Sequence, residues 1–263
     1  MLTYREVQVK TLIKTITWRD QLFHGRYTVD PYQNCEFQCP YCDSSQESTI
    51  YIRINAPEVL EEELGNLETG RVIIGSVNDP YQPVEEKQKL TRKILCILKE
   101  KKFPIHILTK SPLILRDLDI IREMKDPIVT FTLITLKHPT RFEGLAPHPV
   151  KRLEAMTRLN QNRVTSGVAL IPVLPYIIED ELEELIKTIK RYNARYLLYR
   201  FLELKGEQRR IFLSKLDKNL QEKYHELYKE SFLPANWYQR DISNLIEEIC
   251  RGYDIETSIF SVS

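Results

Sequence analysis

Several features that mark secreted, membrane-bound or polyanion-binding proteins are missing from this chain of 263 residues. Its first segment, MLTYREVQVKTLIK, has no uninterrupted apolar region of the kind that directs secretion. No stretch approaches the roughly eighteen apolar residues that a membrane-spanning helix needs. The formal net charge is only +1, so no overall field favours a nucleic acid or a membrane surface. We therefore expect a cytoplasmic protein without a membrane partner.

Internal repeats and low-complexity tracts are also absent, and the chain alternates short β-branched runs with amphipathic helical runs. This alternation is typical of βα units built around a parallel sheet. The predicted strands are one ending near Val29 and then 71–75, 105–109, 128–133, 164–171 and 196–201. The predicted helices between and after them are 56–67, 83–101, 113–124, 149–161 and 181–192. We expect an α/β fold in which these six strands, joined by right-handed crossovers, curl into a partial TIM-type barrel. A closed barrel has about eight strands, and the sequence does not predict that many.

The composition changes toward the C-terminus. Residues 205–230 are charged and helical in character, and 241–253 predict a final amphipathic helix. The positions of that helix expected to face inward are Ile242, Leu245, Ile246 and Ile249. We expect residues 1–204 to form the partial barrel, with a lead-in at 1–21, and residues 205–263 to form a helical extension packed on it.

Three of the five cysteines lie within eight residues, Cys35, Cys39 and Cys42, in the spacing C-x3-C-x2-C. A loop this short closes around one metal centre with little loss of entropy, and thiolates favour iron–sulfur clusters, zinc or copper(I). Structural zinc sites and electron-transfer clusters normally take four protein ligands. The sequence has no second CxxC, and Cys96 and Cys250 stand alone. Three thiolates would leave one position open, and the alternative is a zinc site completed by a distant histidine or aspartate.

The cysteine spacing, with Tyr41 directly before the last cysteine, resembles the signature of the radical S-adenosylmethionine (SAM) superfamily. Further stretches resemble its spore photoproduct lyase-like, or DNA-repair photolyase-like, branch. They are DPYQNC at 30–35, GSVNDPYQPVE at 75–85, LTKSPLILRD at 108–117 and IPVLPY at 171–176. The resemblance covers about residues 22–200 and does not extend to the C-terminal segment.

This resemblance implies a partial (β/α)6 barrel with a [4Fe–4S] cluster, held by the three cysteines, at its C-terminal mouth. It implies that SAM binds the open iron and is cleaved reductively to a 5′-deoxyadenosyl radical. The radical would abstract hydrogen from an unidentified substrate, after a reducing donor such as ferredoxin or flavodoxin has supplied an electron.

The resemblance also implies roles for single residues around SAM. The matching positions are Tyr41, Ser76, Asn78, Asp79, Lys110 and Thr132. Tyr41 would lie by the adenine, Lys110 would pair with the carboxylate, and Ser76 and Thr132 would meet the methionyl end. Lys110 could instead be a surface lysine, and the two hydroxyls could be turn and core groups. Arg152 is a weaker carboxylate or ribose candidate, and a solvated helix residue is the alternative that we favour.

The sequence departs from the lyase pattern at the hydrogen donor. Ser76 stands where the lyase has the cysteine that returns hydrogen to the product radical, and an O–H bond is far stronger than a thiol S–H bond. We expect Cys96 to be a surface thiol and Cys250 a small core residue, so neither replaces that donor. Asn34 precedes Cys35 in place of a glycine, and it can adopt the same left-handed conformation. We therefore do not expect the photoproduct reaction itself.

Three functions remain open. The first is a radical SAM enzyme with an unidentified substrate, and the second acts on a lesion or base in nucleic acid. Basic residues at 99–102 and between 187 and 210, interleaved in the second stretch with aromatic residues, suit single-strand binding. The alternative for the second stretch, which we favour, is a solvated helix followed by a core strand. The third function is a non-enzymatic zinc or iron–sulfur module.

Overall fold

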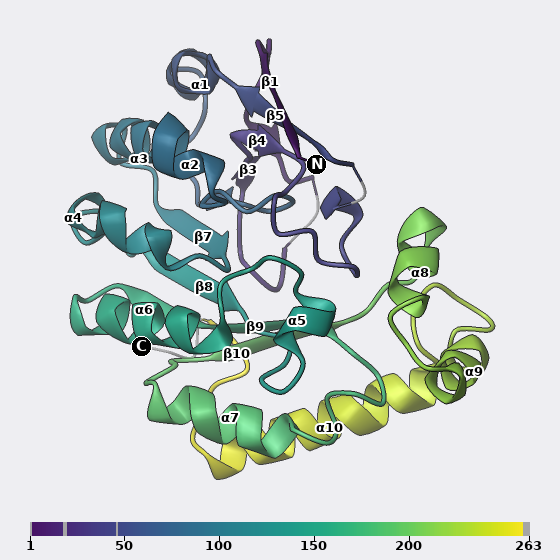
Figure 1. Ribbon diagram of the computed structural model, residues 1–263. Helices are drawn as coiled ribbons and strands as arrows, with labels where there is room; N and C mark the ends of the chain where they lie inside the picture. Colours follow the sequence, from purple (N-terminus) through teal and green to yellow (C-terminus); the bar gives the residue numbers. More distant parts are fainter. Residues whose placement is uncertain (1, 18–19, 46, 260–263) are drawn as a thin grey trace.

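The main sheet contains the strands that the sequence predicts. The computed structural model describes residues 2–17, 20–45 and 47–259, and the sheet has the order β10-β9-β8-β7-β6-β3-β2 (Figure 1). Its strands are β2 (Lys14–Thr15), β3 (Tyr27–Val29), β6 (Val72–Ile74), β7 (Ile105–Thr109), β8 (Ile128–Thr132), β9 (Thr165–Val173) and β10 (Leu197–Phe201). All neighbours from β3 to β10 pair in parallel, and β2 joins β3 antiparallel. Since β2 and β10 are the two edges, the described strands form an open, partial barrel.

Helices cover the outer face of this sheet (Figure 1). They are α1 (Ala56–Leu64), α2 (Val84–Gln88), α3 (Leu90–Glu100), α4 (Leu118–Ile121), α6 (Pro149–Gln161) and α7 (Leu182–Arg191). The strands β6 to β9 are mostly apolar and are buried on both faces, as the inner strands of a parallel sheet require. One core cluster joins strand residues such as Ile107 and Val168 to helix residues such as Ile94, Leu153 and Ile186. Burial of these side chains supplies the main stabilisation of the fold.

Two predicted helices are interrupted. The segment 83–101 forms α2 and α3 because Lys89 between them is left-handed, with φ of 54°. The buried carboxylate of Glu85 accepts hydrogen bonds from the backbone N–H groups of Thr91 and Arg92, which begin the second helix. The segment 113–124 forms a 3-10 helix, Pro112–Asp117, followed by the short α4. A buried carboxylate can thus end one helix and cap the next, which the apolar periodicity does not reveal.

A second, small sheet was not predicted from the sequence. It contains β1 (Thr3–Val7), β5 (Thr49–Arg53) and β4 (Tyr32–Gln33) in the order β1-β5-β4. Strand β1 is exposed along most of its length, so the apolar alternation that would have predicted it is absent. Strands β4 and β5 flank the cysteine segment on either side, and their pairing brings the two ends of that segment together.

The C-terminal segment is helical and contacts the barrel. After α5 (Pro139–Phe142), the remaining helices are α8 (Gly206–Leu213), α9 (Lys218–Leu227) and α10 (Asn236–Gly252). The hydroxyls of Tyr224 and Tyr228 donate to the carbonyls of Pro175 and Leu202 at 2.7 and 2.9 Å. The prediction for Leu245 was wrong: this side chain is exposed. Its place on the buried stripe is taken by Tyr238 and Cys250, one turn before and after Ile242 and Ile246. None of the helices in the described residues could cross a membrane.

Candidate active site

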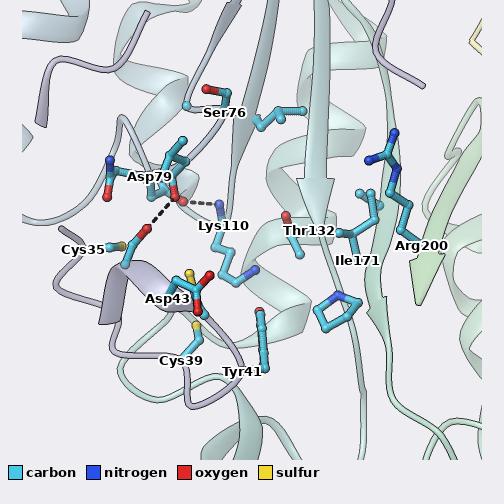
Figure 2. Close-up of a pocket in the computed structure, with 18 of the residues that line it drawn as sticks. Cys35, Cys39, Tyr41, Asp43, Ser76, Asp79, Lys110, Thr132, Ile171 and Arg200 are labelled. Atoms are coloured by element: carbon cyan, nitrogen blue, oxygen red, sulfur yellow. Dashed lines mark hydrogen bonds between the residues drawn. The ribbon is translucent and has the colours of Figure 1, made fainter. Parts of the chain in front are cut away.

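One cavity of about 460 Å³ opens at the carboxyl ends of the parallel strands (Figure 2). The predicted site residues that line it are Cys35, Cys39, Tyr41, Cys42, Ser76, Asn78, Asp79, Lys110 and Thr132. They come from the cysteine loop, from the loop after β6 and from the ends of β7 and β8. A parallel sheet places these strand ends at the same edge, which is why residues distant in sequence meet there. Arg152 is not among the lining residues.

The cysteine loop is fixed by its own backbone. The N–H of Cys35 donates to the carbonyl of Ser44 at 3.1 Å, and the N–H of Cys42 donates to the carbonyl of Cys39 at 3.0 Å. Asn34 has a φ of 66°, so the predicted left-handed conformation is confirmed. Cys35 and Cys39 are buried, Cys42 is half-buried, and all three are free thiols. The loop therefore presents three soft donors to one cavity.

These thiols suit an iron–sulfur cluster, in which separate irons take separate thiolate ligands. Burial raises the pKa of Cys39 to about 11 and raises the pKa of Cys35 as well, so both are protonated unless a metal displaces the protons. Among the described residues, no three His, Cys, Asp or Glu side chains form a group that could hold one metal ion. A cluster held by cysteine thiolates accepts ligands spread around a larger body.

The loop after β6 is held by Asp30, which the sequence analysis did not single out. The Ser76 hydroxyl donates to Asp30 Oδ2 at 2.9 Å, and the N–H groups of Val77 and Asn78 donate to Asp30 Oδ1 at 3.2 and 3.3 Å. Asn78 Nδ2 donates to the carbonyl of Tyr32, while its buried Oδ1 has no hydrogen-bond partner. Ser76 is thus a positioned cavity hydroxyl, and Asn78 has a spare acceptor. The signal for Asp30 was its place at the head of the DPYQNC motif.

Asp79 fastens this loop to the end of β7. Its carboxylate accepts from the Thr109 hydroxyl at 2.7 Å and from the N–H groups of Lys110 and Tyr81 at 2.6 and 2.9 Å (Figure 2). Burial raises the pKa of Asp79, and these hydrogen bonds oppose that shift. Most of the acceptor capacity of the carboxylate is already used, so Asp79 orders the wall of the cavity.

Lys110 is not a surface lysine. It is 9% exposed, and its Nζ lies 3.8 Å from Glu143 Oε1 and 5.6 Å from the centre of the Tyr41 ring. Thr132 is half-buried and faces the same space (Figure 2). The ammonium group is therefore directed into the cavity beside the cysteine loop, where it could meet an anionic group of a ligand.

The expectation that Arg152 is solvated was wrong. Arg152 is completely buried, and its guanidinium donates to Glu143 Oε1 at 2.6 Å and to the carbonyls of Pro147 and Thr132 at 2.7 and 3.0 Å. Arg152 lies on the buried face of α6 beside Leu153 and Met156, but the sequence gave no sign of these polar contacts, because their acceptors lie in a loop and a strand end that the helix packs against. Arg152 therefore supports the cavity from behind its lining residues, by joining Glu143, Pro147 and the end of β8.

Another part of the cavity wall contains residues that no motif indicated. They are Arg200, Glu203, Lys205 and Gln208, from β10, the segment after it and the first turn of α8. Gln208 Nε2 donates to the Tyr41 carbonyl, and Lys205 Nζ lies 2.9 Å from Glu203 and 4.0 Å from Asp43. Arg200 forms no hydrogen bond or ion pair with any residue that the structure describes. The alternation Tyr196, Leu198, Arg200 along β10 was the available sign that Arg200 faces inward.

The basic stretch between 187 and 210 offers little to a nucleic acid. Several of its cations are paired with carboxylates, in the pairs Lys190–Asp254, Arg191–Glu184, Lys205–Glu203 and Arg210–Glu207. Its aromatic side chains are buried or half-buried, and Tyr196 is completely buried. This arrangement agrees with the favoured alternative of a solvated helix followed by a core strand.

Comparisons with known proteins agree with this geometry. The Radical SAM superfamily pattern matches residues 29–189. A protein of uncharacterised function from Methanocaldococcus jannaschii is 28% identical over 76% of this chain and 78% of its own length. One from Mycobacterium tuberculosis is 27% identical over 90% of this chain and 77% of its own length.

Solved structures share the fold. Spore photoproduct lyase complexed with a dinucleoside spore photoproduct superimposes with a TM-score of 0.73 at 13% identity, over 95% of this chain and 79% of the lyase. Streptococcus suis SuiB bound to S-adenosylmethionine gives a TM-score of 0.54 at 16% identity, over 76% and 46% of the two chains. The likeness to the lyase reaches into the C-terminal helices, beyond the part of the chain that the motifs cover.

Proposed function

The chain belongs to the radical SAM superfamily, and from that premise we propose that it uses a [4Fe–4S] cluster and SAM to abstract hydrogen from a substrate. It is an enzyme of this class, so the non-enzymatic module is set aside. The observation that carries the proposal is that three buried or half-buried thiols share one cavity with the cation of Lys110. When bound, the cluster and SAM supply a 5′-deoxyadenosyl radical, and a donor such as ferredoxin or flavodoxin supplies the electron.

Different residues of the cavity would bind different parts of the cluster and of SAM. Cys35, Cys39 and Cys42 would hold three irons of the cluster. The Lys110 ammonium would bind the SAM carboxylate, since it is a compact cation facing the cysteine loop. The free Oδ1 of Asn78 would accept from the amino group of SAM, near Ser76.

Two further contacts complete this arrangement. Thr132 would donate to the methionyl end, and Tyr41 would lie beside the adenine. Asp79 would act through the loop that it fastens, because its carboxylate already accepts three hydrogen bonds.

The substrate would occupy the outer part of the cavity, between Ser76 and Arg200 (Figure 2). Phe23, Ile171 and Leu202 make this part largely apolar, which favours exclusion of water from a reactive radical. The Arg200 guanidinium lacks a partner among the described residues, so it is available to an anionic group of the substrate.

Repair of a thymine photoproduct by the route of the lyase is not part of this proposal. The Ser76 hydroxyl stands at the position of the donor cysteine and donates to Asp30 at 2.9 Å. The remaining thiols do not line the cavity: Cys96 is exposed on α3, and Cys250 is on the buried face of α10.

A nucleic-acid substrate is the second candidate. The free guanidinium of Arg200 could meet a phosphate, and the lyase with the same fold has been solved with a dinucleoside photoproduct. Phosphate contacts would make affinity fall steeply with salt. Titration of a fluorescent single-stranded oligonucleotide at low and high salt tests this candidate, and binding that is absent or independent of salt rejects it.

Anaerobic reconstitution with iron and sulfide tests the main proposal. We expect about four irons per chain and formation of 5′-deoxyadenosine from SAM after reduction with dithionite. Replacement of any one of Cys35, Cys39 or Cys42 by serine abolishes both, whereas Cys96→Ser, on the exposed face of α3, retains both. Bound zinc without cleavage of SAM, or cleavage that survives loss of these cysteines, refutes the proposal. Deuterium transfer from labelled candidate substrates into 5′-deoxyadenosine then identifies the substrate.

A further inference from the structure

Glu143 lies at the centre of a buried charge cluster, of which the proposed function uses only Lys110. It follows α5 and is 1% exposed. Its Oε1 accepts from Arg152 Nη1 at 2.6 Å and lies 3.8 Å from Lys110 Nζ. Two cations and one anion leave this cluster with a net charge of +1, the charge that balances one ligand carboxylate.

The cluster has bonding capacity that the described residues do not satisfy. Glu143 Oε2 and Arg152 Nη2 are both buried without a hydrogen-bond partner. A closed, purely structural ion pair would be expected to satisfy these atoms, because a buried polar group without a partner is costly. The arrangement is thus suited to fixing a charge beside the cavity.

The main chain at Glu143 also holds the cysteine loop. The Glu143 carbonyl accepts a hydrogen bond from the Cys39 thiol, with a sulfur-to-oxygen distance of 3.5 Å. The N–H of Leu145 donates to the carbonyl of Phe37 at 2.7 Å. Gly144 between them is so close to the same loop that a Cβ would lie 2.1 Å from the Phe37 carbonyl oxygen. One residue therefore contacts the cysteine loop through its main chain and lies next to Lys110 through its carboxylate.

We infer that Glu143 is a positioning residue of the cofactor site, which fixes the Lys110 ammonium for the SAM carboxylate and places a constant negative charge beside Cys39. The inference rests on the proposed binding of SAM and a cluster. Arg152 acts behind it by holding the carboxylate in one position. The Glu143 carbonyl lies 3.5 Å from the Cys39 sulfur, so the charged side chain of the same residue belongs to the immediate surroundings of the cysteine loop. The field of this charge would oppose addition of an electron to a cluster bound there.

Glu143→Gln tests the inference, because it keeps the size of the side chain and removes its charge. On the reconstituted, oxidised protein we expect calorimetry to show SAM binding weakened roughly three- to tenfold, the cost of ordering a lysine that has lost its anchor. Redox titration followed by EPR should show a midpoint potential that is more positive than in the wild type. Glu154→Gln is the control, since Glu154 lies on the exposed face of α6 and pairs with Lys151.

A double variant separates charge from structural damage. Glu143→Gln with Arg152→Gln removes one negative and one positive charge, so its potential should return toward the wild-type value while SAM binding stays weak. Unchanged or tighter SAM binding in Glu143→Gln, or a potential unmoved by either variant, overturns the inference. If Glu143→Gln does not retain its irons, Glu143→Asp replaces it, and full SAM affinity in that shortened carboxylate overturns the inference equally. If the wild type binds no SAM, the proposed function itself fails.

Discussion

Gln208 donates a hydrogen bond of 2.8 Å to the carbonyl oxygen of Tyr41, across 167 residues of sequence. Gln208 is buried in the first turn of α8, and its Oε1 accepts from the N–H of Lys205 at 3.2 Å. The side chain of Lys205 in turn lies 4.0 Å from Asp43. The C-terminal helices are thus connected directly to the cysteine loop, and their first turn forms part of the cavity wall.

Gln208→Ala should therefore weaken cofactor binding. Loss of one hydrogen bond of this kind costs about 0.5–1.5 kcal/mol, so we expect SAM affinity, measured by calorimetry, to fall by about two- to tenfold. Gln239→Ala is the matched control, because Gln239 also donates to a backbone carbonyl, that of Pro234, but lies on α10 away from the lining residues. An equal loss of affinity in both variants would mean that only the packing of the extension matters.

A pair of glycine variants tests whether the close contact of Gly144 with the cysteine loop holds that loop in place. Gly144 and Gly206 both have positive φ, 56° and 53°, so alanine at either position carries a similar backbone strain. A Cβ at Gly144 would collide with the Phe37 and Gln38 carbonyls, whereas at Gly206 nothing lies within 4 Å. We expect Gly144→Ala to lose most of its iron after reconstitution and Gly206→Ala to retain it. Equal iron contents would contradict a role for Gly144 in holding the loop.

The sequence was informative where the chemistry is local. The cysteine spacing and the strands ending near Lys110 and Thr132 were predictable, because apolar runs and short loops determine them over a few residues. The small sheet was not, because its pairing joins Thr3–Val7 to a distant strand and leaves most of the first strand exposed. The boundary between barrel and extension at residue 204 remains a prediction.

The residues behind the cavity could not be predicted for a related reason. Arg152 lies on the buried face of α6, and its charge is balanced there by Glu143, which follows α5 in a different segment. Gln208 lies outside every motif and acquires its role from a contact with Tyr41. The spacing of residues along one segment cannot predict a role that depends on the packing of two segments. An alternation of inward-facing residues along one strand, such as the one that ends at Arg200, can be recognised from the sequence.

Lys110→Gln tests the proposed carboxylate contact. The variant keeps a polar side chain and removes the charge, and a charge-assisted hydrogen bond contributes about 1.5–3 kcal/mol. We expect SAM affinity to fall by roughly tenfold to a hundredfold while the iron content stays unchanged. Lys93→Gln on the exposed face of α3 provides the control. Wild-type affinity in Lys110→Gln would show that another group binds the carboxylate.

His106 should give the folded protein a distinct sensitivity to acid. It is completely buried on β7, where its ring nitrogens lie 2.6 Å from the Thr130 hydroxyl and 3.2 Å from the Phe23 carbonyl. Burial lowers the pKa of His106 to about 3, whereas an unfolded histidine titrates near pH 6.5. Between these two pH values, His106 is therefore protonated in the unfolded chain and neutral in the folded chain. The contribution of the neutral His106 to the free energy of unfolding is fully present above about pH 6.5. It is lost at about 1.4 kcal/mol per pH unit as the pH falls toward 3.

Urea denaturation at several pH values between 7 and 4 measures this slope. We expect the free energy of unfolding to fall less steeply with acid in His106→Gln, which has no group to protonate, although the variant is less stable at pH 7 because its fit to Thr130 is imperfect. His225→Gln, at an exposed position on α9, is the control and should keep the wild-type slope. If the His106 and His225 variants gave the same slope, the acid sensitivity would have to come from carboxylates, and the buried imidazole would be neutral in its effect.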